Sequence, residues 1–362
     1  PALAGTRNDA VTLHRHSHPT AARCRGISRR RALVCLLWLW LLWLGGGCCP
    51  SAPQHPRPSC LERRVAFDIG SATTKMKVAD VDVCQLRIVR VLMSDERPVF
   101  YRDDVGGRGA FGPSTMDRGI AVLTAMRAKA DMLGPSTASA VATSAFRRAS
   151  NGPLMVARIK RETGIDVTII SQRQEAVLGF QGAVIARGVE PRNVLVWDVG
   201  GRSMQFCSAR PGRQQPAAGQ PSHAGYDVYE GKLASGQMRD HIVRVVQRKD
   251  GTRQSPNPIS AADAATAVEW ARHHASSLPA HVRAKATDPA TVVIGIGALK
   301  YYGDESSKTT QVYGRATLER RAAALLGKTD AEIGGDYADT QVSDRLLVIG
   351  FMRALGVEQI RT

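Results

Sequence analysis

The sequence has few cysteines in its main part, few aromatic residues and few acidic side chains. Of seven cysteines in 362 residues, only Cys84 and Cys207 follow residue 60, and aromatic residues make up 5% of the chain. Two cysteines do not make a disulfide framework or a zinc site of the usual spacing, so we expect two isolated buried thiols. The 32 acidic residues stand against 49 Lys and Arg, which gives a net charge of +17. This charge favours polyanionic partners such as polyphosphate, nucleotides or anionic lipid, without choosing among them.

Long apolar runs are also missing, since a membrane-spanning helix needs roughly 20 apolar residues. The longest run, residues 32–44, is shorter; three arginines precede it, and glycines, Cys48 and a Pro-rich stretch follow. This layout is typical of a secretory signal, and Cys48 after small residues weakly suggests a lipid anchor. We therefore expect residues 1–62 to be a signal-like segment outside the fold. A real signal implies a periplasmic or membrane-anchored protein, whereas an upstream stretch that is not naturally translated would leave a cytoplasmic one.

The remaining residues have the composition of a folded α/β protein. Apolar residues make up 43% and charged residues 22% of the chain, which is ordinary for a globular protein. Apolar spacing predicts helices over 115–133 and 153–163, and Ser260 with Asp263 predicts a third helix start. Because these helices alternate with short apolar strands, an α/β fold is expected.

Two turns share one pattern 130 residues apart. Each follows an apolar strand, and they read D-I-G-S-A-T at 68–73 and D-V-G-G-R-S at 198–203. Glycine lets the backbone approach a ligand closely, and the turn N–H groups with the hydroxyls can line an anion site. The two aspartates are suited to Mg²⁺ rather than to phosphate itself. A single such turn means little, but two in matched contexts predict two similar lobes that grip a polyphosphate from both sides.

Several further segments resemble the exopolyphosphatase and guanosine pentaphosphate phosphohydrolase family. They are A-T-S-A-F-R at 142–147, I-I-S-Q-R-Q-E-A at 169–176, V-I-G-I-G-A at 293–298 and F-M-R-A-L-G-V at 351–357, together with the two turns. Their order and spacing are similar to the family's over about residues 63–362.

The resemblance implies the two-lobed actin-like ATPase fold, of ribonuclease H-like (ASKHA) type, with a central cleft. We expect one α/β lobe over 63–172, which the C-terminal helix 343–362 is a candidate to complete, and a second over 173–342. The implied activity is Mg²⁺-dependent hydrolysis of terminal phosphoanhydride bonds in inorganic polyphosphate or guanosine pentaphosphate. A homodimer is plausible by the same resemblance, and no specific nucleic-acid partner is expected.

The resemblance also implies roles for individual residues. Glu175 is the expected catalytic base, although a glutamate in the first turn of a helix can also serve only the helix dipole. Asp68 and Asp198 are the expected metal ligands. The expected phosphate contacts come from both turns, the A-T-S-A segment and the later glycine strand: Gly70, Ser71, Thr73, Lys75, Arg147, Gly200, Gly201, Arg202, Ser203 and Gly297.

Four positions depart from the family pattern. Gln172, Arg202 and Gln205 replace family Gly, Gly and Glu, and the later glycine turn lacks its usual Thr. These departures leave a second hypothesis open, a degenerate member that binds polyphosphate or nucleotide without turnover. A third hypothesis is another protein of the actin-like fold, such as a sugar kinase, but a sugar-binding carboxylate and an adenosine site are not evident.

Overall fold

The computed structural model describes residues 60–212, 224–250, 255–302 and 312–362. Ser59–Thr362 is a compact unit separate from Pro1–Pro58. Most of the predicted signal-like segment therefore lies outside the described residues. The first strand begins at Leu61, so the last two residues of that predicted segment belong to the fold. No helix in the described part of the chain is long and apolar enough to cross a bilayer.

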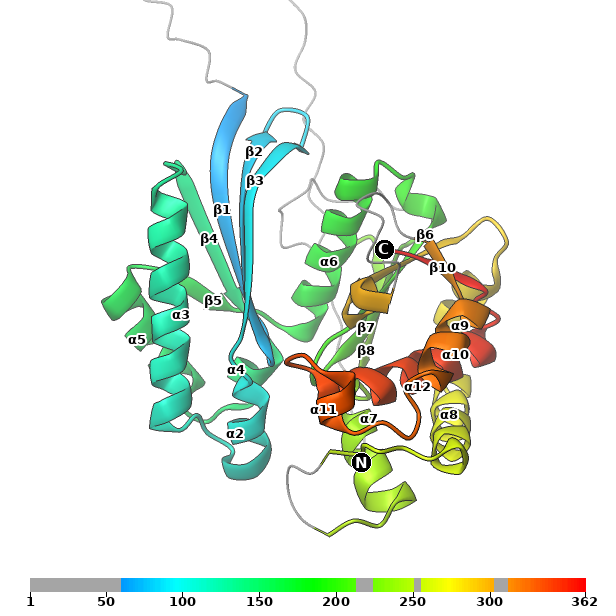
Figure 1. The fold of residues 1–362 in the computed structure, drawn as a ribbon. Helices are drawn as coiled ribbons and strands as arrows, with labels where there is room; N and C mark the ends of the chain where they lie inside the picture. The colour runs from blue at the N-terminus through cyan, green and yellow to red at the C-terminus, as the bar shows by residue number, and fades with distance from the viewer. Residues whose placement is uncertain (1–59, 213–223, 251–254, 303–311) are drawn as a thin grey trace, which may run out of the picture. The chain divides into compact units, whose positions relative to one another are not determined.

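The first lobe is built on a five-stranded sheet in the order β3-β2-β1-β4-β5 (Figure 1). β1 pairs antiparallel with β2 and parallel with β4. Helix α3 lies along the sheet with α5 beside it, and their apolar faces close one core with Phe67, Met76 and Val78. The elements are β1 (Leu61–Ile69), β2 (Thr73–Asp82), β3 (Arg87–Pro98), α2 (Tyr101–Arg108), α3 (Pro113–Asp131), β4 (Thr137–Ala142), α4 (Ser144–Arg148), α5 (Gly152–Thr163) and β5 (Val167–Ile169).

The second lobe is built on a six-stranded sheet in the order β10-β11-β9-β6-β7-β8. Alternate residues of its central strand β6 face opposite sides, as strand geometry requires. Val194 and Val196 pack with α6, whereas Leu195 and Trp197 pack with α8 and α12. The elements are α6 (Gln172–Arg187), η1 (Pro191–Asn193), β6 (Val194–Val199), β7 (Met204–Ala209), β8 (Tyr226–Gly231), α7 (Ser235–His241), η2 (Ile242–Val246), α8 (Ala261–Ser276), α9 (Ala280–Thr287), β9 (Val292–Gly297), η3 (Ala298–Tyr302), β10 (Val312–Gly314), α10 (Arg315–Ala323), α11 (Asp330–Ile333), α12 (Ala338–Leu355) and β11 (Gln359–Arg361).

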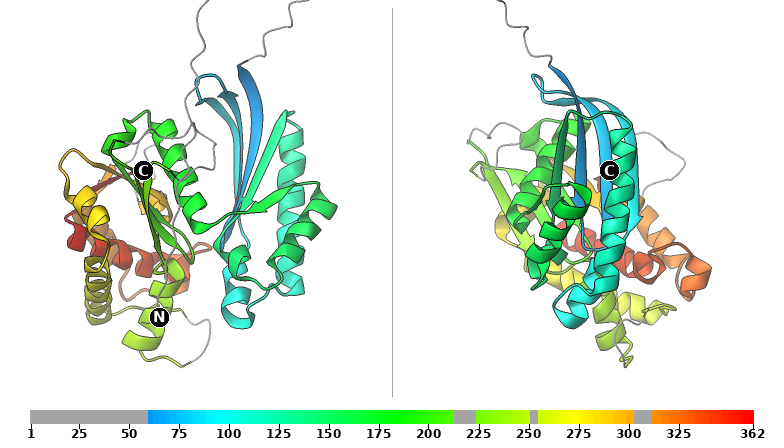
Figure 2. Two further views of the ribbon diagram at one scale, coloured as in Figure 1. Left: turned by 180° about the vertical axis from the view of Figure 1, so that it is seen from behind. Right: turned by 90° about the vertical axis from the view of Figure 1, so that its left-hand side faces the viewer.

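The two sheets repeat one arrangement, so the two-lobed fold is confirmed (Figures 1 and 2). β3-β2-β1-β4 in the first sheet corresponds to β8-β7-β6-β9 in the second, with two antiparallel pairings followed by a parallel one. The predicted helices are also found as α3, α5 and α8, and the Ser260 hydroxyl accepts a hydrogen bond from the Asp263 N–H at 3.0 Å. Each Asp-x-Gly turn therefore follows the central strand of its own lobe.

The C-terminal segment belongs to the second lobe, which corrects the expectation that 343–362 completes the first. Helix α12 packs against α8 and α7, and β11 pairs with β9 and β10. The reason is the apolar surface of α12, where Leu347, Phe351 and Met352 are fully buried against Trp197 and its neighbours.

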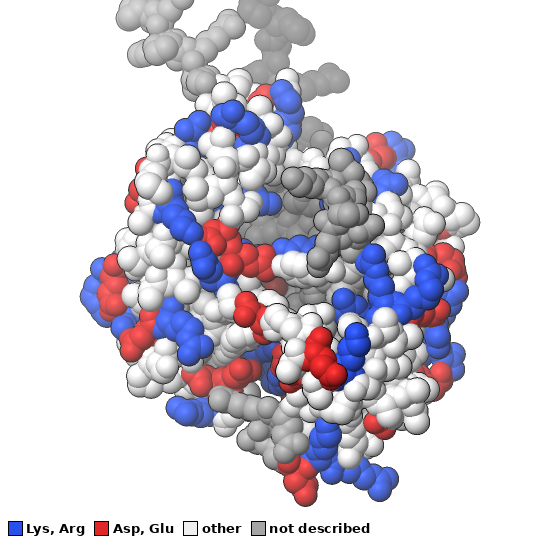
Figure 3. Space-filling view, in the orientation of Figure 1, with Lys and Arg blue, Asp and Glu red and all other residues white. Residues whose placement is uncertain are grey.

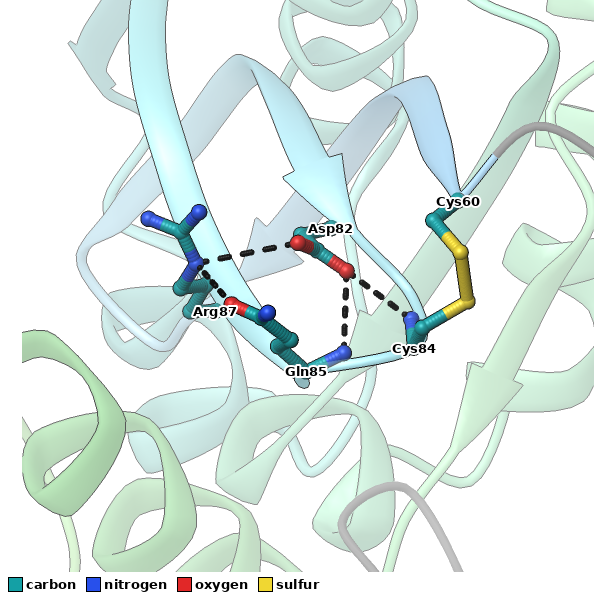
Figure 4. Close-up of a disulfide and its surroundings, with 5 residues drawn as sticks. All are labelled: Cys60, Asp82, Cys84, Gln85 and Arg87. Carbon is teal, nitrogen blue, oxygen red and sulfur yellow. Dashed lines mark hydrogen bonds and ion pairs between the residues drawn. A yellow bond between two sulfur atoms is a disulfide. The ribbon is translucent and has the colours of Figure 1, made fainter.

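One of the two expected isolated thiols is in a disulfide. Cys60 and Cys84 are bonded, with their Cα atoms 5.4 Å apart, and join the start of β1 to the β2–β3 turn (Figure 4). Asp82 orders this turn by accepting hydrogen bonds from the N–H groups of Cys84 and Gln85 at 3.1 and 2.9 Å. Cys207 is buried and unpaired, as predicted. The sequence argument failed for Cys84 because it assigned Cys60 to the excluded N-terminal segment.

Removing the disulfide should lower thermal stability. We expect Cys60→Ser with Cys84→Ser to cost about 3 kcal/mol, because the bond closes a loop of 24 residues. For a body of this size the melting temperature should fall by about 5–10 °C. Thermal unfolding with and without reductant measures this, and reductant should not affect the double variant. A chain that starts at Leu61 should melt below one that starts at Ser59; equal values, or an unresponsive wild type, would contradict the assignment.

Candidate active site

A cavity of about 580 Å³ is lined by both lobes. The predicted residues that line it are Asp68, Gly70, Ser71, Thr73, Lys75, Glu175, Asp198, Gly200, Gly201, Ser203 and Gly297. A larger hollow of about 800 Å³ lies near η1, β7 and α9, but none of the predicted site residues lines it. The smaller cavity is therefore the candidate active site. Figure 3 shows acidic and basic side chains side by side at the edge of a hollow in this face.

The two Asp-x-Gly turns have the same local structure. The Gly70 N–H donates to the Thr73 carbonyl at 2.9 Å, and the Gly200 N–H donates to the Ser203 carbonyl at 2.9 Å. The turns also approach each other closely. A Cβ on Gly201 would lie 3.5 Å from the Ser71 Cβ, so glycine leaves room between them. Two polar turns thus face each other across the cavity, as the repeated pattern predicts.

Three carboxyl groups that line the cavity have raised pKa values. Burial, reinforced by the negative charge of Asp198, raises the pKa of Glu175 to about 7. Burial raises the pKa of Asp198 to about 6, with Lys75 opposing the shift and Asp68 adding to it. The pKa of Asp68 is also raised by burial and held down in part by Lys75. A carboxyl with a pKa near neutrality can take a proton from water at working pH.

Glu175 fits both roles that the sequence allows. It lies in the first turn of α6, where it complements the helix dipole, and it also lines the cavity, where a catalytic base is expected. The Arg147 guanidinium holds it, with Nη1 donating to a Glu175 carboxylate oxygen at 2.9 Å and to the Ile170 carbonyl at 2.8 Å. Arg147 is not among the described residues that line the cavity. Its geometry orients Glu175, and its direct contact with phosphate stays a prediction.

The sheet register explains why charges alternate on the first lobe's side of the cavity. Asp68 on β1 lies opposite Lys75 on β2, which lies opposite Glu96 on β3. Directly opposite residues of antiparallel strands point to the same face of a sheet. One row across three strands therefore presents a carboxylate, an ammonium and a second carboxylate to the cavity.

The donor set is compatible with Mg²⁺. This ion keeps several waters and binds through one or two carboxylates together with substrate phosphates. Asp68 and Asp198 supply two carboxylates that line the cavity, and the buried Ser71 hydroxyl has no hydrogen-bond partner among the described residues. The oxygens of Asp68, Asp198 and Glu175 do not gather within 4.8 Å of one another; in the described residues only Cys60, Asp82 and Cys84 do so, and these cysteines are bonded to each other. The site thus fits an ion shared with substrate better than a cage of protein ligands.

The structure pairs Arg202 with Asp240, and its expected contact with phosphate stays a prediction. Its Nη1 donates to an Asp240 carboxylate oxygen at 3.1 Å, and its side chain packs against Gly236 of α7. Arg202 is not among the described residues that line the cavity. The turn pattern predicted the backbone position, but tertiary packing decided where this long side chain points.

Gln172 and Gln174 at the start of α6 have structural roles, whereas the structure does not explain Gln205. Gln172 donates to the Met204 and Gly231 carbonyls at 3.1 and 2.8 Å, which ties the start of α6 to the second sheet. Gln174 accepts a hydrogen bond from the Ser171 N–H at 2.8 Å and completes the capping box of α6. Gln205 lies opposite Asp198 in the register, is buried, and neither amide atom has a hydrogen-bond partner within the described ranges.

Sequence reasoning missed a second arginine at the cavity. Arg102 on α2 lines it although its side chain is only 3% exposed, and its Nη1 lies within 3.4 Å of where a Gly201 Cβ would stand. Its nearest carboxylates, Asp103 and Asp339, are 3.7 and 3.9 Å away. Such a guanidinium, buried between the turns and loosely paired, suits an anion. Only the R-D-D sequence at 102–104 could have drawn attention to it.

Comparisons with known proteins agree with this geometry. The model of the Ppx/GppA phosphatase family matches residues 78–216. The resemblance to this family is confirmed. Two solved structures similar to this chain are the Ppx/GppA family member of Aquifex aeolicus, 17% identical with a TM-score of 0.61, and an exopolyphosphatase from Cytophaga hutchinsonii, 20% identical with a TM-score of 0.62. Each comparison covers 83% of this chain and 93% of the other.

A curated relative matches over a shorter stretch. The bifunctional 3-dehydroquinate synthase/phosphatase of Fusobacterium nucleatum subsp. nucleatum is 26% identical over 148 residues, 40% of this chain. The match spans 22% of that relative's length. The two solved structures share the two-lobed α/β fold of this chain, and the family resemblance supports a phosphatase-type hydrolase.

Proposed function

We propose that this protein hydrolyses terminal phosphoanhydride bonds of inorganic polyphosphate or of guanosine pentaphosphate, with Mg²⁺. The observation that carries the proposal is a buried Glu175 with a pKa near 7, held by Arg147 beside two facing glycine turns. The family resemblance supports a phosphatase-type hydrolase, and the two-sided cavity suits a polyanion.

The chemical step requires a base and compensation of charge. Glu175 takes a proton from the attacking water while the water oxygen forms the new P–O bond. The bridging oxygen leaves with the shortened chain and keeps the electron pair of the broken bond. The turn N–H groups, Lys75 and Arg102 hold the phosphate oxygens as charge develops there. A Mg²⁺ ion held by Asp68 and Asp198 would neutralise phosphate charge.

A direct assay tests the proposal. We expect the purified protein to release phosphate from long-chain polyphosphate, and EDTA should remove this activity. Guanosine pentaphosphate and ATP are tested in parallel. The comparison distinguishes a polyphosphatase from a guanosine pentaphosphate hydrolase and from a general nucleotide hydrolase. Saturable binding of polyphosphate with no phosphate release from any substrate would favour the degenerate binder, a hypothesis that the unsatisfied Gln205 keeps open.

We also propose that the folded body works in an oxidising compartment. The Cys60–Cys84 bond supports this, because structural disulfides persist mainly outside the cytosol, and the signal-like sequence of residues 1–62 agrees. Such a location favours polyphosphate over a cytosolic nucleotide. Fractionation of the natural host, with the protein detected by antibody, tests it; an entirely cytosolic protein with free Cys60 and Cys84 would contradict it.

A further inference from the structure

Glu96 joins the two lobes at the edge of the cavity. The Lys300 ammonium donates to a Glu96 carboxylate oxygen at 2.9 Å, and the Tyr301 hydroxyl donates to the other. Glu96 comes from β3 of the first sheet, whereas Lys300 and Tyr301 come from η3, directly after β9 of the second. Glu96 and Tyr301 line the cavity next to Lys75, and Lys300 reaches this edge of it through its contact with Glu96.

The carboxylate lies among groups that are suited to an anion. Lys75 is directly opposite Glu96 in the β2–β3 register. The positive charge of Lys75, together with burial, lowers the pKa of Lys300, so the two ammonium groups are near enough to repel each other. Lys300, Lys75 and the Tyr301 hydroxyl together hold down the pKa of Glu96 against its burial. Two ammonium groups and a hydroxyl donor around one carboxylate form an anion site that the chain itself fills.

We infer that Lys75, Lys300 and Tyr301 form a subsite for a phosphate group beyond the terminal one, which Glu96 occupies when no substrate is bound. This inference rests on the proposed function and adds where a second phosphate group of the substrate binds and which side chain it displaces. A phosphate that enters the subsite displaces the Glu96 carboxylate and takes over its donors. A lone phosphate held between the glycine turns leaves this contact in place.

The inference separates multi-phosphate ligands from single ones. Displacing the Glu96 carboxylate costs free energy, so Glu96 lowers the affinity for any phosphate chain that reaches the subsite. It does not change the affinity for orthophosphate, which leaves Glu96 in place. Calorimetry measures the binding of sodium tripolyphosphate and of orthophosphate to the full chain. These ligands represent a phosphate chain and a single phosphate, and the measurement does not require turnover. We expect Glu96→Gln to tighten tripolyphosphate binding by about 5- to 20-fold, because a competing charge is removed at a partly screened site. Lys300→Ala should weaken it by a similar factor, and neither change should move orthophosphate affinity by more than about twofold.

The neighbouring residue on the same strand is a matched control. Asp95 precedes Glu96 but pairs with Lys129 of α3 at 2.5 Å, on the other face of the sheet. Asp95→Asn removes the same charge and should leave tripolyphosphate binding unchanged.

Each outcome decides the inference separately from the proposed function. Tighter tripolyphosphate binding by Glu96→Gln supports the subsite even if no variant releases phosphate, a result that would overturn only the hydrolase. Unchanged or weaker binding by Glu96→Gln, an equal gain for orthophosphate, or an equal effect of Asp95→Asn would overturn the subsite. It would also be overturned if neither wild type nor Glu96→Gln bound tripolyphosphate.

Discussion

Glu175→Gln should lower phosphate release from polyphosphate by a factor of about 10²–10⁴, the usual contribution of a general base. The amide keeps the shape of the side chain and can still accept from Arg147, but it cannot take a proton from water. Initial rates under saturating polyphosphate measure the loss. Tripolyphosphate affinity and melting temperature should stay close to wild type, which separates a chemical defect from a folding defect. An active Glu175→Gln protein would require that another carboxylate activates the water.

The same residue predicts a direction of pH dependence. A base acts in its deprotonated form, and burial places the pKa of Glu175 at about 7. Between pH 5 and 7, kcat/KM should therefore rise by about tenfold per unit and then level off. The residual activity of Glu175→Gln should lack this rise. A wild-type rate already level at pH 5 would show that Glu175 is not the titrating base.

Gly297→Ala should reduce both stability and activity strongly. Gly297 ends β9 with φ +68°, and an added Cβ would lie 2.4 Å from the Val199 carbonyl oxygen and 2.5 Å from Asp198 Oδ1. Backbone strain and overlap together should cost about 3 kcal/mol or more. Because relief of the overlap moves the Asp198 carboxylate, Mg²⁺-dependent turnover should fall further than unfolding alone explains. Thermal unfolding and Mg²⁺ titration of activity measure the two effects.

Gly356→Ala is the control for that substitution. Gly356 follows α12 with φ +65°, and nothing lies within 4 Å of its added Cβ. The free energy of unfolding of Gly356→Ala should fall by about 1 kcal/mol because of backbone conformation alone, and its turnover should stay that of wild type. Equal losses in both variants would mean that the contact with Asp198 has no effect of its own.

Local sequence patterns predicted structure correctly where the stabilising contacts lie within one short segment. Ser260 predicted the start of α8 because its hydroxyl caps a nearby N–H. The two Asp-x-Gly turns predicted two matched hairpins, since the glycine N–H and the backbone carbonyl three residues later close each turn. The matched turns placed Asp68 and Asp198 at two facing sites, whereas Glu175 was assigned through the family resemblance of its own segment.

Contacts between distant segments could not be predicted in this way. Glu96 and Lys300 are 204 residues apart, and no local pattern pairs them. Cys60 was assigned to the wrong side of a domain boundary, so its bond with Cys84 was missed. The C-terminal helix was placed in the wrong lobe, because an apolar face shows that a helix is buried but not which partner it meets.

The sequence by itself determined the α/β class, the two similar lobes and the two turn aspartates, because each depends on backbone periodicity or on residues within one turn. Glu175 was added by the resemblance of its segment to the family. Only the tertiary structure decided that Arg147 orients Glu175, that Arg202 pairs with Asp240, and that Arg102 lines the cavity instead. The physical reason is the length of the arginine side chain. A backbone position fixes its Cα, whereas the direction of its charged end depends on which carboxylates and carbonyls other elements bring within reach.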